Sequence, residues 1–162
     1  MPTTSVLIAD DHEIVRRGVR ALLESESDLK VVGEASDGLQ TLDAVELLRP
    51  DILVLDLMLP EKSGLEVLRQ IAEWNLDTRV VVFTMYSNEA YAVEALKYGA
   101  QAYVIKNADT DELITALRDV LDGRRYLSPP LSAAEIESLA HDMEGRGDRL
   151  ESLSPREKQV LQ

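Results

Sequence analysis

The sequence predicts an open, doubly wound parallel α/β sheet, and two observations lead to that fold class. Five short apolar runs rich in Val, Ile and Leu occur before Lys106, and a helical pattern follows each of them. The runs are nearly continuous rather than alternating, which is typical of parallel strands buried on both faces. Strands that alternate with helices favour a parallel sheet covered by helices on both faces. The expected strands are Ser5–Ala9, Lys30–Ala35, Asp51–Leu57, Arg79–Thr84 and Ala102–Ile105.

The expected helices carry apolar residues at helical spacing and end at recognisable stop signals. The second, about 38–49, ends before Pro50, because the residue before a proline disfavours the α conformation. The fourth, about 88–98, ends at Gly99, a residue suited to a helix C-cap. The apolar faces of the first, third and fifth helices contain Val15, Val19, Leu22 and Leu23; Leu65, Leu68, Ile71 and Ala72; and Leu113, Ile114, Leu117, Val120 and Leu121.

The alternation of strands and helices ends near Gly123, which we take as the end of a first domain, 1–123. Residues 124–130 contain the turn-forming pair Pro129-Pro130 and are expected to form an exit turn. A short helix is predicted from Ser132 to about Met143, and a glycine-containing stretch follows it. The sequence therefore predicts a C-terminal linker over 124–152 that is helical in part.

Composition excludes several classes of protein. The net charge is −13, and residues 1–123 hold 23 acidic and 11 basic residues, a net charge of −12. Such a domain repels a phosphate backbone, so we expect a cation or a basic partner rather than nucleic acid. The absence of cysteine excludes disulfides and thiolate metal sites, and it fits a cytoplasmic protein. No apolar run approaches the roughly 18 residues of a membrane helix, and the N-terminus lacks a signal-peptide pattern.

Acidic residues follow two strands that the predicted fold places side by side. In a flavodoxin-like (βα)5 sheet with strand order 2-1-3-4-5, ligands bind at the ends of strands 1 and 3. Asp10 and Asp11 follow the first strand, and Asp56 lies at the end of the third. Three close carboxylates repel one another unless a cation lies among them, and oxygen ligands favour Mg2+. The alternative for Asp10 or Asp11 alone is an N-cap of the first helix.

Two further polar residues end the remaining strands at the same edge of the sheet. Thr84 ends the fourth strand, and Lys106 directly follows the fifth. Alone, each is an ordinary residue for its position. Beside the carboxylates, a hydroxyl and an ammonium group can hydrogen-bond phosphoryl oxygens and offset their charge.

This set of residues resembles the receiver domain of bacterial two-component response regulators over about residues 5–122. The stretch 55–60, followed by Ser63-Gly64, is similar to the phosphorylation loop of that family. The resemblance implies that Asp56 accepts a phosphoryl group from a sensor histidine kinase. It also implies that Thr84 and Lys106 bind this group. The Mg2+ ligands that it implies are Asp10, Asp11, Asp56 and the backbone carbonyl of Met58.

The resemblance also implies a conformational switch. Thr84 would move towards the phosphoryl group, and an aromatic residue of the fifth strand would turn inward. Tyr103 matches that position; the alternative is a static, half-buried strand tyrosine. Homodimerisation on phosphorylation is the expected consequence. Met58 and Tyr86 occupy positions that flank the path of the hydrolytic water in this family. Because neither orients water well, we expect slow autodephosphorylation by a signalling switch, not a turnover enzyme.

The last residues, 153–162, begin with a helix-start signal. Ser154 and Glu157 form a capping box, and Pro155 occupies the first helical position. The segment resembles the opening of the LuxR-type helix-turn-helix domain found in the NarL/FixJ subfamily. A chain that stops within the first effector helix is the interpretation, with a natural C-terminus as the alternative. DNA would then be bound through an effector domain that the sequence lacks.

Three rival functions remain open at this stage. A Mg2+-dependent phosphohydrolase also uses an aspartyl nucleophile, but that class has an Asp-x-Asp motif after strand 1, where this sequence has adjacent Asp10-Asp11. A flavodoxin-type cofactor binder would need a phosphate-binding loop at the same place. A receiver-like module that is never phosphorylated is the third.

His12 is interpreted as an ordinary residue of the first helical turn.

Overall fold

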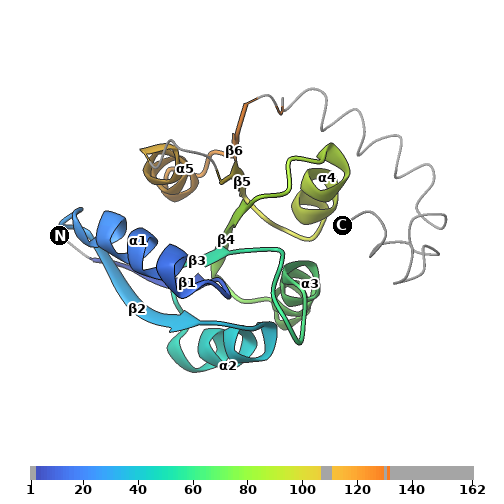
Figure 1. The fold of residues 1–162 in the computed structure, drawn as a ribbon, viewed down its shortest axis with the longest axis horizontal. Coiled ribbons are helices and arrows are strands. Elements are labelled where there is room, and N and C mark those ends of the chain that lie inside the picture. The colour runs from blue at the N-terminus through green and yellow to red at the C-terminus, as the bar shows by residue number, and fades with distance from the viewer. Residues whose placement is uncertain (1–2, 107–110, 130, 132–162) are drawn as a thin grey trace.

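The computed structural model describes residues 3–106, 111–129 and 131. They form a parallel six-stranded sheet of order β2-β1-β3-β4-β5-β6 (Figure 1), so the predicted flavodoxin-like order 2-1-3-4-5 is confirmed and extended by one strand. The strands are β1 Thr4–Ala9, β2 Leu29–Ala35, β3 Ile52–Leu55, β4 Arg79–Thr84, β5 Ala102–Ile105 and β6 Tyr126–Leu127. The helices are α1 Glu13–Glu24, α2 Gly38–Leu48, α3 Gly64–Trp74, α4 Glu89–Lys97 and α5 Asp111–Leu121.

The helices cover the sheet in two layers. Helices α1 and α5 lie on one face, and α2, α3 and α4 lie on the other (Figure 1). Consecutive residues of the central strands pack into opposite cores because strand side chains alternate between faces. In β3, for example, Leu53 packs under α2 and α3, whereas Val54 packs under α1 and α5. The continuous apolar runs of the sequence are thus explained by burial on both sides.

Local signals set the helix boundaries. The side chains of Asp37, Ser63 and Asn88 cap α2, α3 and α4 by accepting hydrogen bonds from backbone N–H groups of the first turn. At the other end, α4 stops at its C-cap Tyr98, and the following Gly99 has a φ of +105°. The predicted end of the fourth helix is therefore confirmed, since this left-handed backbone suits glycine.

Among the strands, two segments differ from the sequence-based expectation by more than one residue. Strand β3 was predicted to reach Leu57, but it ends at Leu55, where the chain turns into the loop that leads to α3. The exit turn predicted over 124–130 is wrong at Tyr126–Leu127, which form β6 alongside β5. A parallel strand of two residues has no periodicity to recognise, and it forms because β5 would otherwise leave an unpaired edge.

The predicted linker helix from Ser132 and the predicted helix start over 153–162 lie outside the described residues. Among the described helices, none is both long and apolar enough to span a bilayer.

Candidate phosphoryl and metal site

The carboxyl ends of β1 and β3 bring two buried carboxylates together. Ala9 and Leu55 are paired in the sheet, and the backbone N–H of Asp56 donates to the carbonyl of Ala9 at 3.0 Å. Asp10 and Asp56 directly follow these two residues at the ends of β1 and β3, and they are only 2% and 3% exposed. One carboxylate oxygen from each of Asp10, Asp56 and Asp11 lies within 4.8 Å of the others, so the predicted gathering is confirmed.

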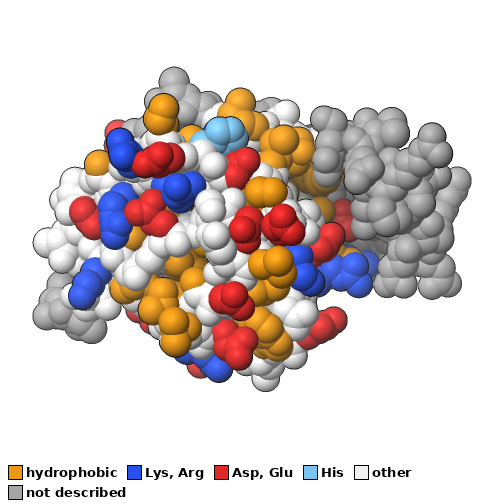
Figure 2. Space-filling view, turned by 60° about the horizontal axis from the view of Figure 1, so that its bottom comes forward, with side chains coloured by type: hydrophobic (Ala, Val, Ile, Leu, Met, Phe, Trp, Pro, Cys, Tyr) orange, Lys and Arg blue, Asp and Glu red, His pale blue; other side chains and the backbone are white. Residues whose placement is uncertain are grey.

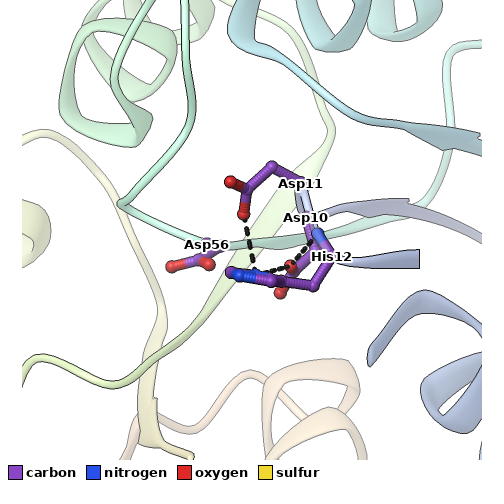
Figure 3. A group of neighbouring side chains, drawn as sticks. All are labelled: Asp10, Asp11, His12 and Asp56. Carbon is purple, nitrogen blue, oxygen red and sulfur yellow. Dashed lines mark hydrogen bonds and ion pairs between the residues drawn. The ribbon is translucent and has the colours of Figure 1, made fainter. Parts of the chain in front are cut away.

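His12 completes this group from the start of α1 (Figure 3). Its Nδ1 lies 2.9 Å from Asp11 Oδ1 and 3.3 Å from Asp10 Oδ1. Its backbone N–H donates to Asp10 Oδ1 at 2.9 Å, which holds the residue in an extended conformation as the N-cap of α1. The interpretation of His12 as a residue of the first helical turn is therefore wrong by one position. The alternative in which Asp10 or Asp11 is the N-cap of the first helix is also wrong, because His12 occupies that position.

The ammonium group of Lys106 lies between the two buried carboxylates. Its Nζ donates to Asp10 Oδ2 and, at 3.0 Å, to Asp56 Oδ2. Burial disfavours the charged ammonium, but the hydrogen bonds to Asp10 and Asp56 and their negative charges outweigh it. The pKa of Lys106 is therefore raised above its ordinary value. The ammonium group of Lys106 therefore contacts Asp56, the residue that the family resemblance implies as the phosphoryl acceptor.

Thr84 and Tyr103 lie on the two neighbouring strands and are both fully buried. The Thr84 hydroxyl accepts a hydrogen bond from the backbone N–H of Tyr86 at 3.4 Å, and the Tyr103 hydroxyl donates to the Tyr86 carbonyl at 2.7 Å. Burial, together with the charges of Tyr91 and Asp56, raises the pKa of the Tyr103 hydroxyl. Tyr103 is buried in this structure, and the backbone of Tyr86 joins it to Thr84.

Close backbone packing positions the loop of residues 56–63, which follows β3. A Cβ added to Gly64 would lie 2.5 Å from the carbonyl oxygen of Asp56, and one added to Gly38 would lie 2.0 Å from that of Lys62. The N–H groups of these glycines donate to the carbonyls of Leu57 and Pro60. The N-termini of α2 and α3 therefore clamp the loop at two points, and Met58 N–H donates to Asp56 Oδ1 at 3.1 Å.

The donor set fits a hard divalent cation. Asp10, Asp11 and Asp56 supply carboxylate oxygens, which Mg2+ prefers, and the side chain of Asp11 is 34% exposed, so the group is open to solvent. Acidic side chains are otherwise spread over the visible face and mixed with basic ones (Figure 2). Convergence on one point, rather than overall acidity, is what distinguishes this group.

Comparison with known families matches residues 6–118 to the response regulator receiver domain. The chain belongs to that family. This receiver is 37% identical over 157 residues to the nitrate/nitrite response regulator protein NarL of Escherichia coli strain K12, covering 97% of this chain and 73% of NarL. The predicted affiliation with NarL-type response regulators is thereby confirmed, and membership argues against the phosphohydrolase and flavodoxin-type rivals.

Solved structures agree with this assignment. The receiver superposes with a TM-score of 0.76 on a LuxR-family two-component response regulator from Aurantimonas sp. SI85-9A1, at 37% identity over 88% of this chain and 98% of that one. The signal receiver domain of the putative response regulator NarL from Mycobacterium tuberculosis gives a TM-score of 0.73 at 31% identity. The superposition covers 76% of this chain and 100% of the Mycobacterium tuberculosis domain.

Sequence reasoning missed two residues, Arg16 and Tyr91, that contact residues at or beside the receiver's site. Arg16 donates to the backbone carbonyl of Asp10 at 2.7 Å and pairs with Glu34 of β2, so it holds the turn after β1. Tyr86 stacks on Tyr91 of α4, with ring centroids 4.7 Å apart. These contacts join residues that are distant in sequence or lie on a turn. No periodic pattern in the sequence therefore predicts them.

Proposed function

We propose that this receiver accepts a phosphoryl group on Asp56 from a sensor histidine kinase in a Mg2+-dependent reaction. In doing so it would switch a C-terminal DNA-binding, transcription-regulatory domain. The observation that carries the proposal is the position of Asp56: buried, hydrogen-bonded to the Lys106 ammonium, and within reach of the carboxylates of Asp10 and Asp11. The proposed setting is the cytoplasm, where such kinases present phosphohistidine to their receivers.

The chemistry follows from the charges at the site. A carboxylate oxygen of Asp56 attacks phosphorus, a P–O bond forms, and the P–N bond to the kinase histidine breaks with the electron pair leaving on the imidazole. Mg2+ would be held by Asp10, Asp11, Asp56 and the Met58 carbonyl, and would neutralise phosphoryl charge. Lys106 is already within hydrogen-bond reach of Asp56 and would donate to a phosphoryl oxygen.

The proposed switch uses the connection through Tyr86. Phosphorylation changes Asp56 from one negative charge to about two and adds acceptor oxygens. A hydrogen bond donated by the Thr84 hydroxyl to a phosphoryl oxygen therefore becomes favourable. Because Thr84 and Tyr103 bind the N–H and the carbonyl of the same residue, Tyr86, a shift of Thr84 reaches Tyr103 through the backbone of one residue. We propose homodimerisation of the phosphorylated receiver as the outcome.

The decisive experiment is intact-mass measurement after incubation with acetyl phosphate. Wild-type protein should gain the mass of one phosphoryl group when Mg2+ is present and none after chelation. Asp56→Asn should gain none in either condition, because an amide is not a nucleophile of comparable strength. The exposed Asp43→Asn on α2 is the matched control and should behave as wild type. Labelling of Asp56→Asn, or steady turnover of p-nitrophenyl phosphate, would count against the proposal.

A second prediction concerns the lifetime of phospho-Asp56. Met58 is 46% exposed beside the site, and Tyr86 is stacked on Tyr91, so neither is placed to orient a water molecule. Replacing them together, Met58→Asn with Tyr86→Glu, should speed autodephosphorylation by about tenfold or more, since both new side chains can hydrogen-bond water. The measurement is the decay of the phosphorylated mass after removal of the donor. Met85→Asn, a similarly exposed methionine one residue before Tyr86, should leave the decay rate unchanged; equal rates for wild type and the double variant would contradict the hypothesis.

A further inference from the structure

The chain that leaves α5 is bound along the free edge of β5. This edge segment, Tyr126–Pro129 together with Leu131, contains β6, which lies beside β5 at one edge of the sheet (Figure 1). Tyr126 N–H donates to the Gln101 carbonyl at 3.3 Å, and Ser128 N–H donates to the Tyr103 carbonyl at 2.9 Å. Tyr103, the proposed switch residue, is therefore one of the residues that anchor it.

Ser128 is the tightest point of this attachment. It is fully buried, and its hydroxyl accepts a hydrogen bond from the backbone N–H of Ile105 at 2.9 Å. The same hydroxyl donates to a carboxylate oxygen of Glu112 on α5. A buried hydroxyl with both roles satisfied resists displacement, because each lost partner would leave a desolvated polar group. Ile105 directly precedes Lys106, so Ser128 grips β5 next to the residue that contacts Asp56.

Apolar packing places the two ends of the edge segment on opposite faces of the sheet. Tyr126 packs with the core under α1 and α5, whereas Leu127 packs with the core under α2, α3 and α4. Leu131 is 6% exposed and belongs to this second core together with Tyr103 and Tyr91. The segment therefore shares a hydrophobic core with Tyr103 and with Tyr91, which stacks on Tyr86.

We propose that the edge segment is the output element of the receiver. Its attachment to β5 is thermodynamically coupled to occupation of the Asp56 site, so that occupation makes release of the segment rarer. Two chains of contacts carry the coupling. One runs from Asp56 through Lys106 and Ile105 to Ser128. The other runs from Thr84 through Tyr86 to Tyr103, whose carbonyl binds Ser128 and whose side chain shares a core with Leu131. The inference rests on the proposed function and adds how that site reaches the chain beyond α5.

Coupling of this kind must be reciprocal. A group bound at Asp56 that engages Lys106 and Thr84 favours the arrangement of β5 in which the edge segment is attached to it. Opening of the edge segment therefore becomes rarer. Conversely, complete release of the edge segment must weaken binding at Asp56 by the same factor by which binding makes opening rarer. Independent opening of the segment would show neither effect.

The first arm of the test measures amide hydrogen exchange by NMR in the whole chain, with Mg2+ and with or without beryllofluoride as the phosphoryl mimic. Exchange at the amides of Ile105, Ser128 and Leu131 should slow by at least about fivefold when beryllofluoride binds, the lower end of ordinary coupling. The amide of Thr4, which donates to Asp28 at the far end of the sheet, reports general stabilisation and should slow less. Asp56→Asn should show no response. Equal slowing of Thr4 and the segment, or no slowing at the segment, overturns the inference.

The second arm measures beryllofluoride affinity by fluorine NMR titration. Ser128→Ala and the milder Leu131→Ala should weaken binding, by up to the same factor of about five or more in a variant whose segment amides have lost their protection from exchange. Thr78→Ala is the matched control, because it removes one hydroxyl hydrogen bond, to the Pro50 carbonyl at 2.8 Å, at the opposite end of the sheet. Unchanged affinity in a folded variant whose segment amides have lost their protection from exchange overturns the coupling. Failure of wild-type protein to bind beryllofluoride would instead overturn the proposed function itself.

Discussion

Replacing Lys106 with Met should lower the free energy of unfolding by about 3 kcal/mol in magnesium-free buffer at neutral pH, the low end of the cost of breaking a buried ion pair. The ammonium group is the cation shared by Asp10 and Asp56, whose side chains are each 3% exposed. Without it, two buried carboxylates face each other and Asp11 with no compensating charge. Urea denaturation followed by circular dichroism measures the change.

Magnesium provides the internal check of this result. A divalent ion among the same carboxylates should restore part of the lost stability, and the gain on adding Mg2+ should be larger for Lys106→Met than for wild type. Lys30→Met, at an exposed position of β2, is the control and should change stability by less than about 0.5 kcal/mol. A Lys106→Met protein as stable as wild type without Mg2+ would show that the carboxylates do not depend on this ammonium group.

Replacing Gly64 with Ala should destabilise the receiver by about 1–3 kcal/mol and disturb the phosphoryl site at the same time. A Cβ there would lie 2.5 Å from the Asp56 carbonyl oxygen and 2.6 Å from the Leu57 Cα, distances at which the backbone must move. Since these atoms belong to the loop that carries Asp56, beryllofluoride affinity should fall together with the denaturation midpoint.

Gly18 supplies a control of opposite sign. It lies inside α1 with no heavy atom within 4 Å of an added Cβ. Gly18→Ala should therefore stabilise the protein by about 0.5–1 kcal/mol, because alanine has the higher helix propensity. Should Gly64→Ala also prove neutral or stabilising, the clamp on the phosphorylation loop would be refuted.

The sequence predicted the order of the elements and the chemistry of the strand ends because both depend on local signals. Continuous apolar runs mark strands buried on two faces, and Asp10, Asp56, Thr84 and Lys106 each follow or end such a run. Once a parallel sheet with a given strand order is assumed, the carboxyl ends of its strands must share one edge. The convergence of Asp10, Asp11 and Asp56 follows from that geometry.

Tertiary structure alone decided the features that depend on contacts between distant residues. The pairing of Lys106 with both buried carboxylates, the seat of Ser128 on β5 and the two-residue strand β6 have no periodic pattern in the sequence. The same holds for Gly38 and Gly64, which are ordinary turn residues until another segment approaches their Cα atoms. A hydrogen bond or a close backbone approach needs both partners in place. The partner's position is set by the packing of the whole sheet, not by neighbouring residues.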